Sequence, residues 1–143
     1  MLKVLLAVDG SENAIRATQM LIDTLGWYKE QPHIDLLAVH PLVHRFPNMG
    51  LGVSNEMIEQ YYVEETEDLL MPSKALLDAA GVMYTAHRSV GPIAESIVEQ
   101  AKQFGSDMIC MGTRGRTGLT NMVLGSVATR VLHLARIPVV LIP

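Results

Sequence analysis

Several features are missing from the sequence, and each absence excludes a class of protein. A single cysteine, Cys110, can form no disulfide within the chain. No apolar run approaches the roughly 20 residues that a membrane-spanning helix needs. The N-terminus enters an apolar strand pattern without the basic region and cleavage site of a signal peptide. We therefore expect a cytoplasmic protein with no membrane association.

Positive charge and metal-ligand patterns are also scarce. The chain has 11 Lys and Arg against 15 Asp and Glu, a formal net charge of −4. Nucleic-acid surfaces need a basic patch, so we expect no nucleic-acid partner. His40 and His44 are four residues apart, but Pro41 prevents them from starting a helix together, and no HExxH or Cys/His spacing occurs. No metal ligands are expected, and without a GxSxG elbow a hydrolase triad has no support.

The remaining composition is that of a folded domain. The chain has 143 residues, of which 49% are hydrophobic and 18% charged, and we expect one domain over residues 1–143. Apolar periodicity predicts strands at 2–8, 34–39, 82–88, 108–111 and 139–142. Helices are predicted from a Ser11 cap to Gly26, from a Ser54 cap to about Ala80, from Pro92 to Gly105, and after Gly125. Pro72 predicts a kink or a break in the second helix. The segment 41–53 has no periodicity and is predicted to be a loop.

The alternation of strands and helices predicts an α/β fold with a five-stranded parallel sheet and helices on both faces. The first, second and fourth strands are the most apolar, so they should be central, and 82–88 should be an edge. An order of 3-2-1-4-5 satisfies these conditions. In that order the ligand site lies where the strand order reverses, between the first and fourth strands.

A glycine-rich segment lies at that point. The strand 108–111 is followed by Gly112, Gly115 and Gly118, and a new helix pattern begins at Gly125-Ser126. Glycines let backbone N–H groups approach an anion, and a helix start offers unpaired donors, so the segment predicts a phosphate site. No lysine precedes a Ser or Thr, so this is not a Walker A loop, and the spacing is not GxGxxG.

The spacing Gly112-x2-Gly115-x9-Gly125-Ser126 resembles the nucleotide-binding signature of the ATP-binding branch of the universal stress protein family. The resemblance covers the whole chain, including the opening strand that ends in Val8-Asp9-Gly10-Ser11 and the closing segment 138–143. It implies a single-domain member with the 3-2-1-4-5 order, a Rossmann-like fold of the adenine nucleotide alpha hydrolase type.

The resemblance also implies that the cofactor is ATP, with Mg²⁺ held mainly by the phosphates. By position, Asp9 would lie near the ribose and base, Ala7 and Val39 near the adenine, and Met111 along the ribose. The full set of expected binding residues is Ala7, Asp9, Val39, Met111, Gly112, Arg114, Gly115, Gly125, Ser126 and Val127. Two alternatives stay open: Asp9 as a turn-forming residue, and Arg114 and Arg116 as solvated loop arginines.

The last predicted strand, 139–142, is fully apolar and would lie at a sheet edge, which invites pairing with another chain. We expect a homodimer through this strand, unless the chain's own loop covers it. The resemblance implies a nucleotide-dependent regulator or sensor in the stress response, with at most weak ATP hydrolysis and no catalytic residue assigned. The alternatives are a slow ATPase or phosphotransfer enzyme in which Asp9 places a metal or water, and a dimeric interaction module that binds no nucleotide.

Overall fold

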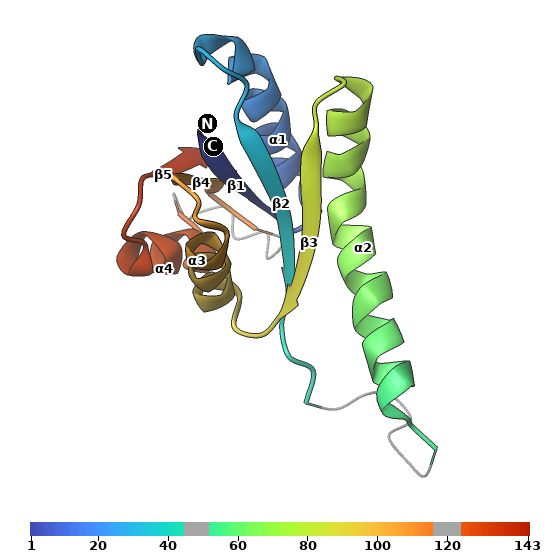
Figure 1. Ribbon diagram of the computed structural model, residues 1–143. Coiled ribbons are helices and arrows are strands. Elements are labelled where there is room, and N and C mark those ends of the chain that lie inside the picture. Colours follow the sequence, from blue (N-terminus) through green and yellow to red (C-terminus); the bar gives the residue numbers. More distant parts are fainter. Residues whose placement is uncertain (45–51, 116–123) are drawn as a thin grey trace.

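The computed structural model describes residues 1–44, 52–115 and 124–143; the predicted Gly118 and Arg116 and part of the loop 41–53 lie outside them. The strands are β1 (Lys3–Val8), β2 (His33–His40), β3 (Tyr84–Val90), β4 (Met108–Gly112) and β5 (Val139–Ile142). The helices are α1 (Glu12–Thr24), α2 (Asn55–Ala79), α3 (Ile93–Phe104) and α4 (Ser126–Leu134), with a short 3₁₀ turn, Leu25–Trp27, after α1 (Figure 1).

The strands form one parallel sheet in the order β3-β2-β1-β4-β5, which confirms the predicted order. In the central register Val4 lies opposite Ile34 of β2 on one side and Met108 of β4 on the other. Helices α1 and α2 cover one face of the sheet, and α3 and α4 cover the other (Figure 1). The strand order therefore reverses between β1 and β4, where a ligand site is expected.

The core has two halves, because successive side chains of a strand point to opposite faces. Leu6 packs with the apolar sides of α1 and α2, whereas Leu5 and Leu37 pack with those of α3 and α4. All three leucines are fully buried. Burial on both faces explains why β1 is apolar from Val4 to Val8 and β2 from Leu36 to Val39, without period-two alternation.

The helix ends test the predicted boundaries. The Ser11 hydroxyl accepts a hydrogen bond from the Ala14 amide at 3.1 Å, which confirms the predicted cap of α1. The predicted position of Pro92 is wrong by one residue: its ψ of 125° is extended, so it precedes the helix that starts at Ile93. β3 begins two residues later than predicted, because Val82 N–H still bonds to the Leu77 carbonyl in the turn that ends α2.

Pro72 does not divide the second helix in two, and that alternative is wrong. α2 runs without interruption from Asn55 to Ala79, although proline removes one backbone donor. Buried residues lie on both sides of Pro72, with Leu70 before it and Leu77 after it, so both parts of the helix pack against the core. Within the ranges that the structure describes, no helix combines the length and apolar character required to cross a membrane.

Candidate functional site

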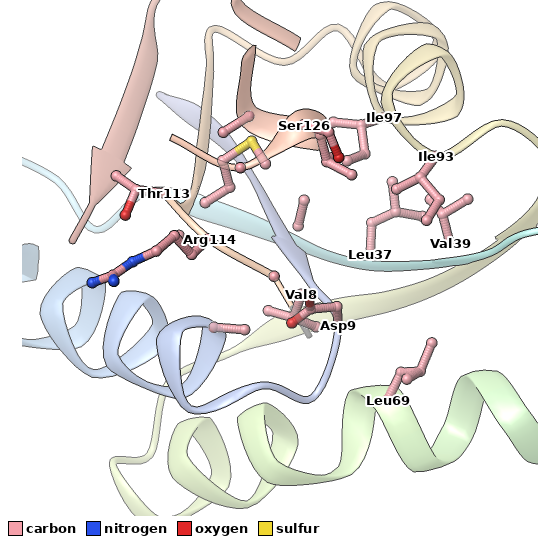
Figure 2. A pocket seen from close by; sticks show the side chains of 18 of the residues that line it. Val8, Asp9, Leu37, Val39, Leu69, Ile93, Ile97, Thr113, Arg114 and Ser126 are labelled. Carbon is pink, nitrogen blue, oxygen red and sulfur yellow. The ribbon is translucent and has the colours of Figure 1, made fainter. Parts of the chain in front are cut away.

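A cavity of about 320 Å³ opens at the carboxyl ends of β1 and β4, at the point where the strand order reverses (Figure 2). Its volume lies in the range of small-molecule sites. All the residues that the sequence predicted for nucleotide binding line it: Ala7, Asp9, Val39, Met111, Gly112, Arg114, Gly115, Gly125, Ser126 and Val127. Segments more than a hundred residues apart in the sequence thus meet at one cavity.

One side of this cavity is an apolar wall. Leu37 and Val39 of β2 and Ile93 and Ile97 of α3 form it, and they lie together in Figure 2. Such a surface suits a flat, weakly polar ring. Sequence reasoning found Val39 but missed the other three as site residues, because their apolar periodicity predicts burial equally well whether they face the core or a cavity.

The signature glycines border the same cavity, and a close neighbour explains each of them. Gly112, Gly115 and Gly125 are absent from the glycines with positive φ, so their backbone angles do not require glycine. A Cβ on Gly112 would lie 2.5 Å from Asn13 Oδ1, and one on Gly115 would lie 2.9 Å from Asp9 Oδ2. A Cβ on Gly125 would lie 3.3 Å from the Thr113 carbonyl oxygen. Close approach of other groups, rather than backbone strain, therefore favours glycine at these positions, and most strongly at Gly112.

Asp9 follows β1, and its two carboxylate oxygens have different surroundings. Oδ1 accepts a hydrogen bond from the Ser11 amide at 3.0 Å, so the turn-forming role left open by the sequence is present. Oδ2 lies beside Gly115, at the cavity (Figure 2). The turn holds the carboxylate in place, which leaves Oδ2 available to accept a hydrogen bond from a bound hydroxyl group.

The start of α4 supplies donors to the cavity. Gly125 is the N-cap residue, and its own N–H donates to the Thr113 carbonyl at 2.6 Å. The amides of Ser126 and Val127, which line the cavity, belong to the first turn, where an α-helix offers its N–H groups no internal partner. These donors and the positive end of the helix dipole make the end of the cavity at α4 suitable for an anion.

Arg114 lines the cavity, but its side chain is exposed and extends away from the apolar wall in Figure 2. The side chain is thus solvated here, and its role in neutralising phosphate charge stays a prediction. The other predicted loop arginine, Arg116, lies outside the described residues.

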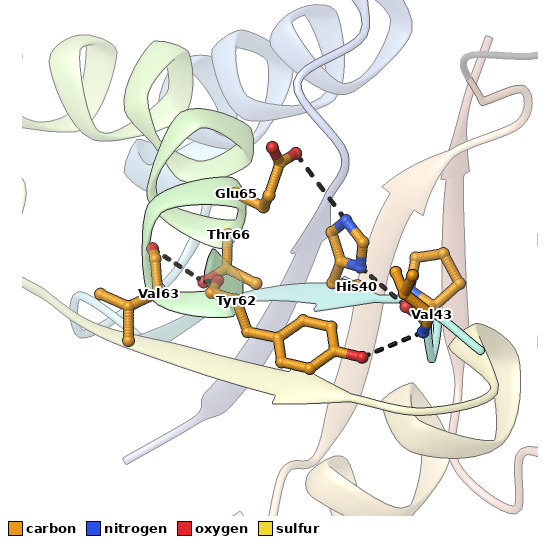
Figure 3. A network of polar contacts seen from close by, with 7 residues as sticks. His40, Val43, Tyr62, Val63, Glu65 and Thr66 are labelled. Atoms are coloured by element: carbon orange, nitrogen blue, oxygen red, sulfur yellow. Dashed lines mark hydrogen bonds and ion pairs between the residues drawn. The ribbon is translucent and has the colours of Figure 1, made fainter. Parts of the chain in front are cut away.

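His40, at the end of β2, lies at the cavity and joins a polar network with α2 (Figure 3). Its Nδ1 is 2.7 Å from the Pro41 carbonyl oxygen, and its Nε2 is 3.8 Å from Glu65 Oε2. The Val43 amide donates to the Tyr62 hydroxyl at 3.0 Å. These contacts hold the first residues after β2 against α2.

The described residues offer neither a group of metal ligands nor a reactive thiol. Across residues 1–44, 52–115 and 124–143, no three His, Cys, Asp or Glu side chains gather in a group that would hold a metal ion. Cys110 lies in β4, close to the glycine segment, but burial raises the pKa of its thiol to about 12. The reactive thiolate is therefore strongly disfavoured at neutral pH.

Comparison with known proteins gives a consistent family. The model of the universal stress protein family matches residues 1–143. Universal stress protein MJ0531 of Methanocaldococcus jannaschii is 33% identical over 141 residues, 98% of this chain and 81% of the relative. The solved structure of hypothetical protein MJ0577 aligns with a TM-score of 0.78 at 26% identity, over 99% of this chain and 94% of that one.

Two more distant structures of the same fold hold a nucleotide. A universal stress protein from Archaeoglobus fulgidus in complex with dAMP aligns with a TM-score of 0.63 at 23% identity, over 100% of this chain and 98% of that one. An AMP-bound universal stress protein family protein from Arabidopsis thaliana aligns with a TM-score of 0.65 at 19% identity, over 99% and 91% of the two chains. At these sequence identities the structural similarity shows a shared fold alone.

Proposed function

The chain belongs to the universal stress protein family, and from this premise we propose that it binds an adenine nucleotide, ATP, in the cavity between β1 and β4. The observation that carries the proposal is that an apolar wall and a set of phosphate-type donors border one cavity. The adenine would lie along Val39 and Ile93, the ribose hydroxyls near Asp9, and the phosphates at the glycine segment and the first turn of α4. The adenine nucleotides held by the A. fulgidus and A. thaliana proteins support this assignment.

The residues present fit such a ligand. Gly115 and Gly125 line the cavity without side chains, and Ser126 and Val127 line it from the first turn of α4, where an α-helix offers its N–H groups no internal partner. Among the described lining residues Asp9 is the only carboxylate. A Mg²⁺ ion would therefore be held mainly by the phosphate oxygens, as is usual for this cation.

Within this proposal the protein is a nucleotide-dependent regulator or sensor in the stress response rather than an efficient enzyme. The segment from Gly112 to Ser126 contains no lysine. In Walker A loops a lysine reaches the β- and γ-phosphates, and such a group stabilises the charge that moves during phosphoryl transfer. Binding without rapid turnover is the behaviour expected of a sensor.

The test begins with gently purified protein, which is denatured so that the released small molecules can be identified by mass spectrometry. Calorimetric titrations with AMP, ADP and ATP plus magnesium follow. We expect about one nucleotide per chain, and its loss in Gly125→Val. The matched control is Gly26→Val, because a Cβ on Gly26 meets nothing within 4 Å. Absence of nucleotide, together with no heat of binding for any of the three ligands, would contradict the proposal.

We also propose that two copies associate through β5. This strand lies at one edge of the sheet and consists of Val139–Ile142, with Val140 38% exposed. Uncovered apolar edges favour pairing with another strand. The test is light scattering on Val140→Lys, expected to be monomeric, against Val90→Lys on the opposite edge, where the valine is 37% exposed. A wild-type monomer, or a dimer lost in both variants, would refute the β5 interface.

A further inference from the structure

Asn13, the second residue of α1, is a polar side chain buried where an amphipathic helix would place an apolar one. Its exposure is 6%, and both ends of its amide make hydrogen bonds outside the helix. Oδ1 accepts from the Arg114 amide at 2.6 Å, in the segment that follows β4. Nδ2 donates to the Ile142 carbonyl at 3.0 Å, at the end of β5. Asn13 therefore connects three elements at one end of the sheet.

The contacts of Asn13 determine the path of the backbone from Gly112 to Arg114. The Ile142 carbonyl also accepts from the Thr113 amide at 2.9 Å, so residues 113 and 114 are each held by a hydrogen bond within this small network. The amide of Asn13 lies where a Cβ of Gly112 would be. Residues 112–114 are thus held by hydrogen bonds at 113 and 114 and by close contact at 112.

From these contacts we propose that Asn13 is a positioning residue for the phosphate: it orients the Gly112–Gly115 backbone so that this backbone and the start of α4 converge on the anion. The inference rests on the proposed nucleotide site. A glycine-rich segment has high conformational entropy when free. Backbone donors bind an anion well only if they are already oriented, since ordering them on binding reduces affinity.

The chemistry of the position explains why asparagine stands here. One partner is a backbone donor and the other a backbone acceptor, and a side-chain amide offers an acceptor and a donor on one carbon. Aspartate would turn one oxygen toward the Ile142 carbonyl, acceptor against acceptor. Leucine would fill the same volume without either bond.

The test is the affinity of Asn13→Leu for AMP and for adenosine, measured by calorimetry. AMP and adenosine differ in the phosphate, so the ratio of their dissociation constants reports on the phosphate contacts. We expect AMP to bind to Asn13→Leu about tenfold more weakly than to wild type. Donors that are no longer oriented reduce the binding free energy by roughly the contribution of one or two hydrogen bonds. Adenosine should change by less than about twofold, because its proposed contacts lie at the apolar wall and Asp9.

The control is Thr18→Val, also on α1. Thr18 is fully buried, and its hydroxyl bonds to the Ala14 carbonyl within α1 and to the Ser73 hydroxyl of α2 rather than to residues 112–115. This near-isosteric change removes buried hydrogen bonds from the same helix, so it destabilises the protein in a comparable way. The AMP-to-adenosine ratio should stay at its wild-type value.

The outcomes separate this inference from the proposed function. An unchanged ratio in Asn13→Leu, or an equal loss for adenosine and AMP, would overturn the positioning role while leaving the site in place. A wild-type protein that binds neither ligand would overturn the proposed function and the inference with it. If Asn13→Leu does not fold, the side-chain amide resonance of wild-type Asn13 gives the answer: a shift on AMP but not on adenosine supports the role, and no phosphate-dependent shift overturns it.

Discussion

Replacement of Gly115 by alanine tests the contact between the glycine segment and Asp9. The backbone of Gly115 does not have a positive φ, and the residue is exposed, so alanine is compatible with its own position. The new Cβ would nevertheless lie 2.9 Å from Asp9 Oδ2, and ordinary contact begins near 3.4 Å. The carboxylate must therefore move by about half an ångström.

The movement has a calculable cost, because the other carboxylate oxygen is held by the Ser11 amide at 3.0 Å. If the carboxylate gives up that bond, the folded state loses about 1 kcal/mol. If it keeps the bond, Oδ2 is misdirected, and a hydrogen bond from a bound hydroxyl weakens by a similar amount or up to about 2 kcal/mol. We expect Gly115→Ala to weaken the binding of both adenosine and AMP by roughly 5- to 30-fold. Stability should fall by at most about 1 kcal/mol.

The assay is a double-mutant cycle with calorimetry on wild type, Gly115→Ala, Asp9→Ala and the double variant. In the Asp9→Ala background the carboxylate is gone, so Gly115→Ala should cost little further affinity. Additive losses would refute the argument, since they would mean that the two positions act independently. The effect on the two ligands also differs from that of Asn13→Leu. In Gly115→Ala the affinities for adenosine and for AMP should fall together, because Asp9 is expected to contact the ribose.

Three further outcomes follow from single contacts. Ser11→Ala removes the cap hydrogen bond to Ala14 and should lower the free energy of unfolding by about 1 kcal/mol in urea titrations; an unchanged midpoint would contradict this. Cys110, whose thiol pKa is raised to about 12 by burial, should resist thiol reagents at pH 8 until the chain unfolds, and rapid labelling of native protein would contradict this. Burial, together with the hydrogen bond to Asp78, raises the pKa of Tyr84 to about 12, so stability from its neutral phenol should be lost as the pH rises from about 10 toward 12. Asp78→Ala should lower that pKa in an absorbance titration, and identical curves would count against the assignment.

The strand order could be predicted from the sequence because burial on both faces leaves a clear trace. β1 is apolar from Val4 to Val8 and β2 from Leu36 to Val39, and 139–142 is short. The position of the cavity followed from the order alone, since ligands bind where the strand order of a parallel sheet reverses, here between β1 and β4. Boundaries were less predictable. The residue before a helix and the first residue within it differ in ψ, and Pro92 fits both positions because its ring fixes only φ.

The lining of the cavity was predictable only in part, for a physical reason. Ile93 and Ile97 lie on the apolar side of α3, and periodicity predicts that they are covered without saying whether by protein or by a ligand. Asn13 left only a weak trace, an asparagine two residues after the helix cap Ser11. That trace has no meaning until the partners are known, because Arg114 and Ile142 lie more than a hundred residues away in the sequence.

These long-range partners change how the glycine signature should be understood. Gly112 is required because the amide of Asn13 occupies the place of its Cβ, and Gly115 because the carboxylate of Asp9 does nearly the same. The segment Asp9 to Asn13 and the signature are therefore two halves of one steric unit, assembled when β1 and β4 pair. A chain with the glycine spacing but with a shorter side chain in place of Asp9 would lose the steric reason for glycine at position 115, whereas a Cβ at position 112 would still lie 3.2 Å from the backbone oxygen of residue 13. Substitutions in one half should accordingly depend on the residue present in the other, and the cycle between Asp9 and Gly115 measures that dependence directly.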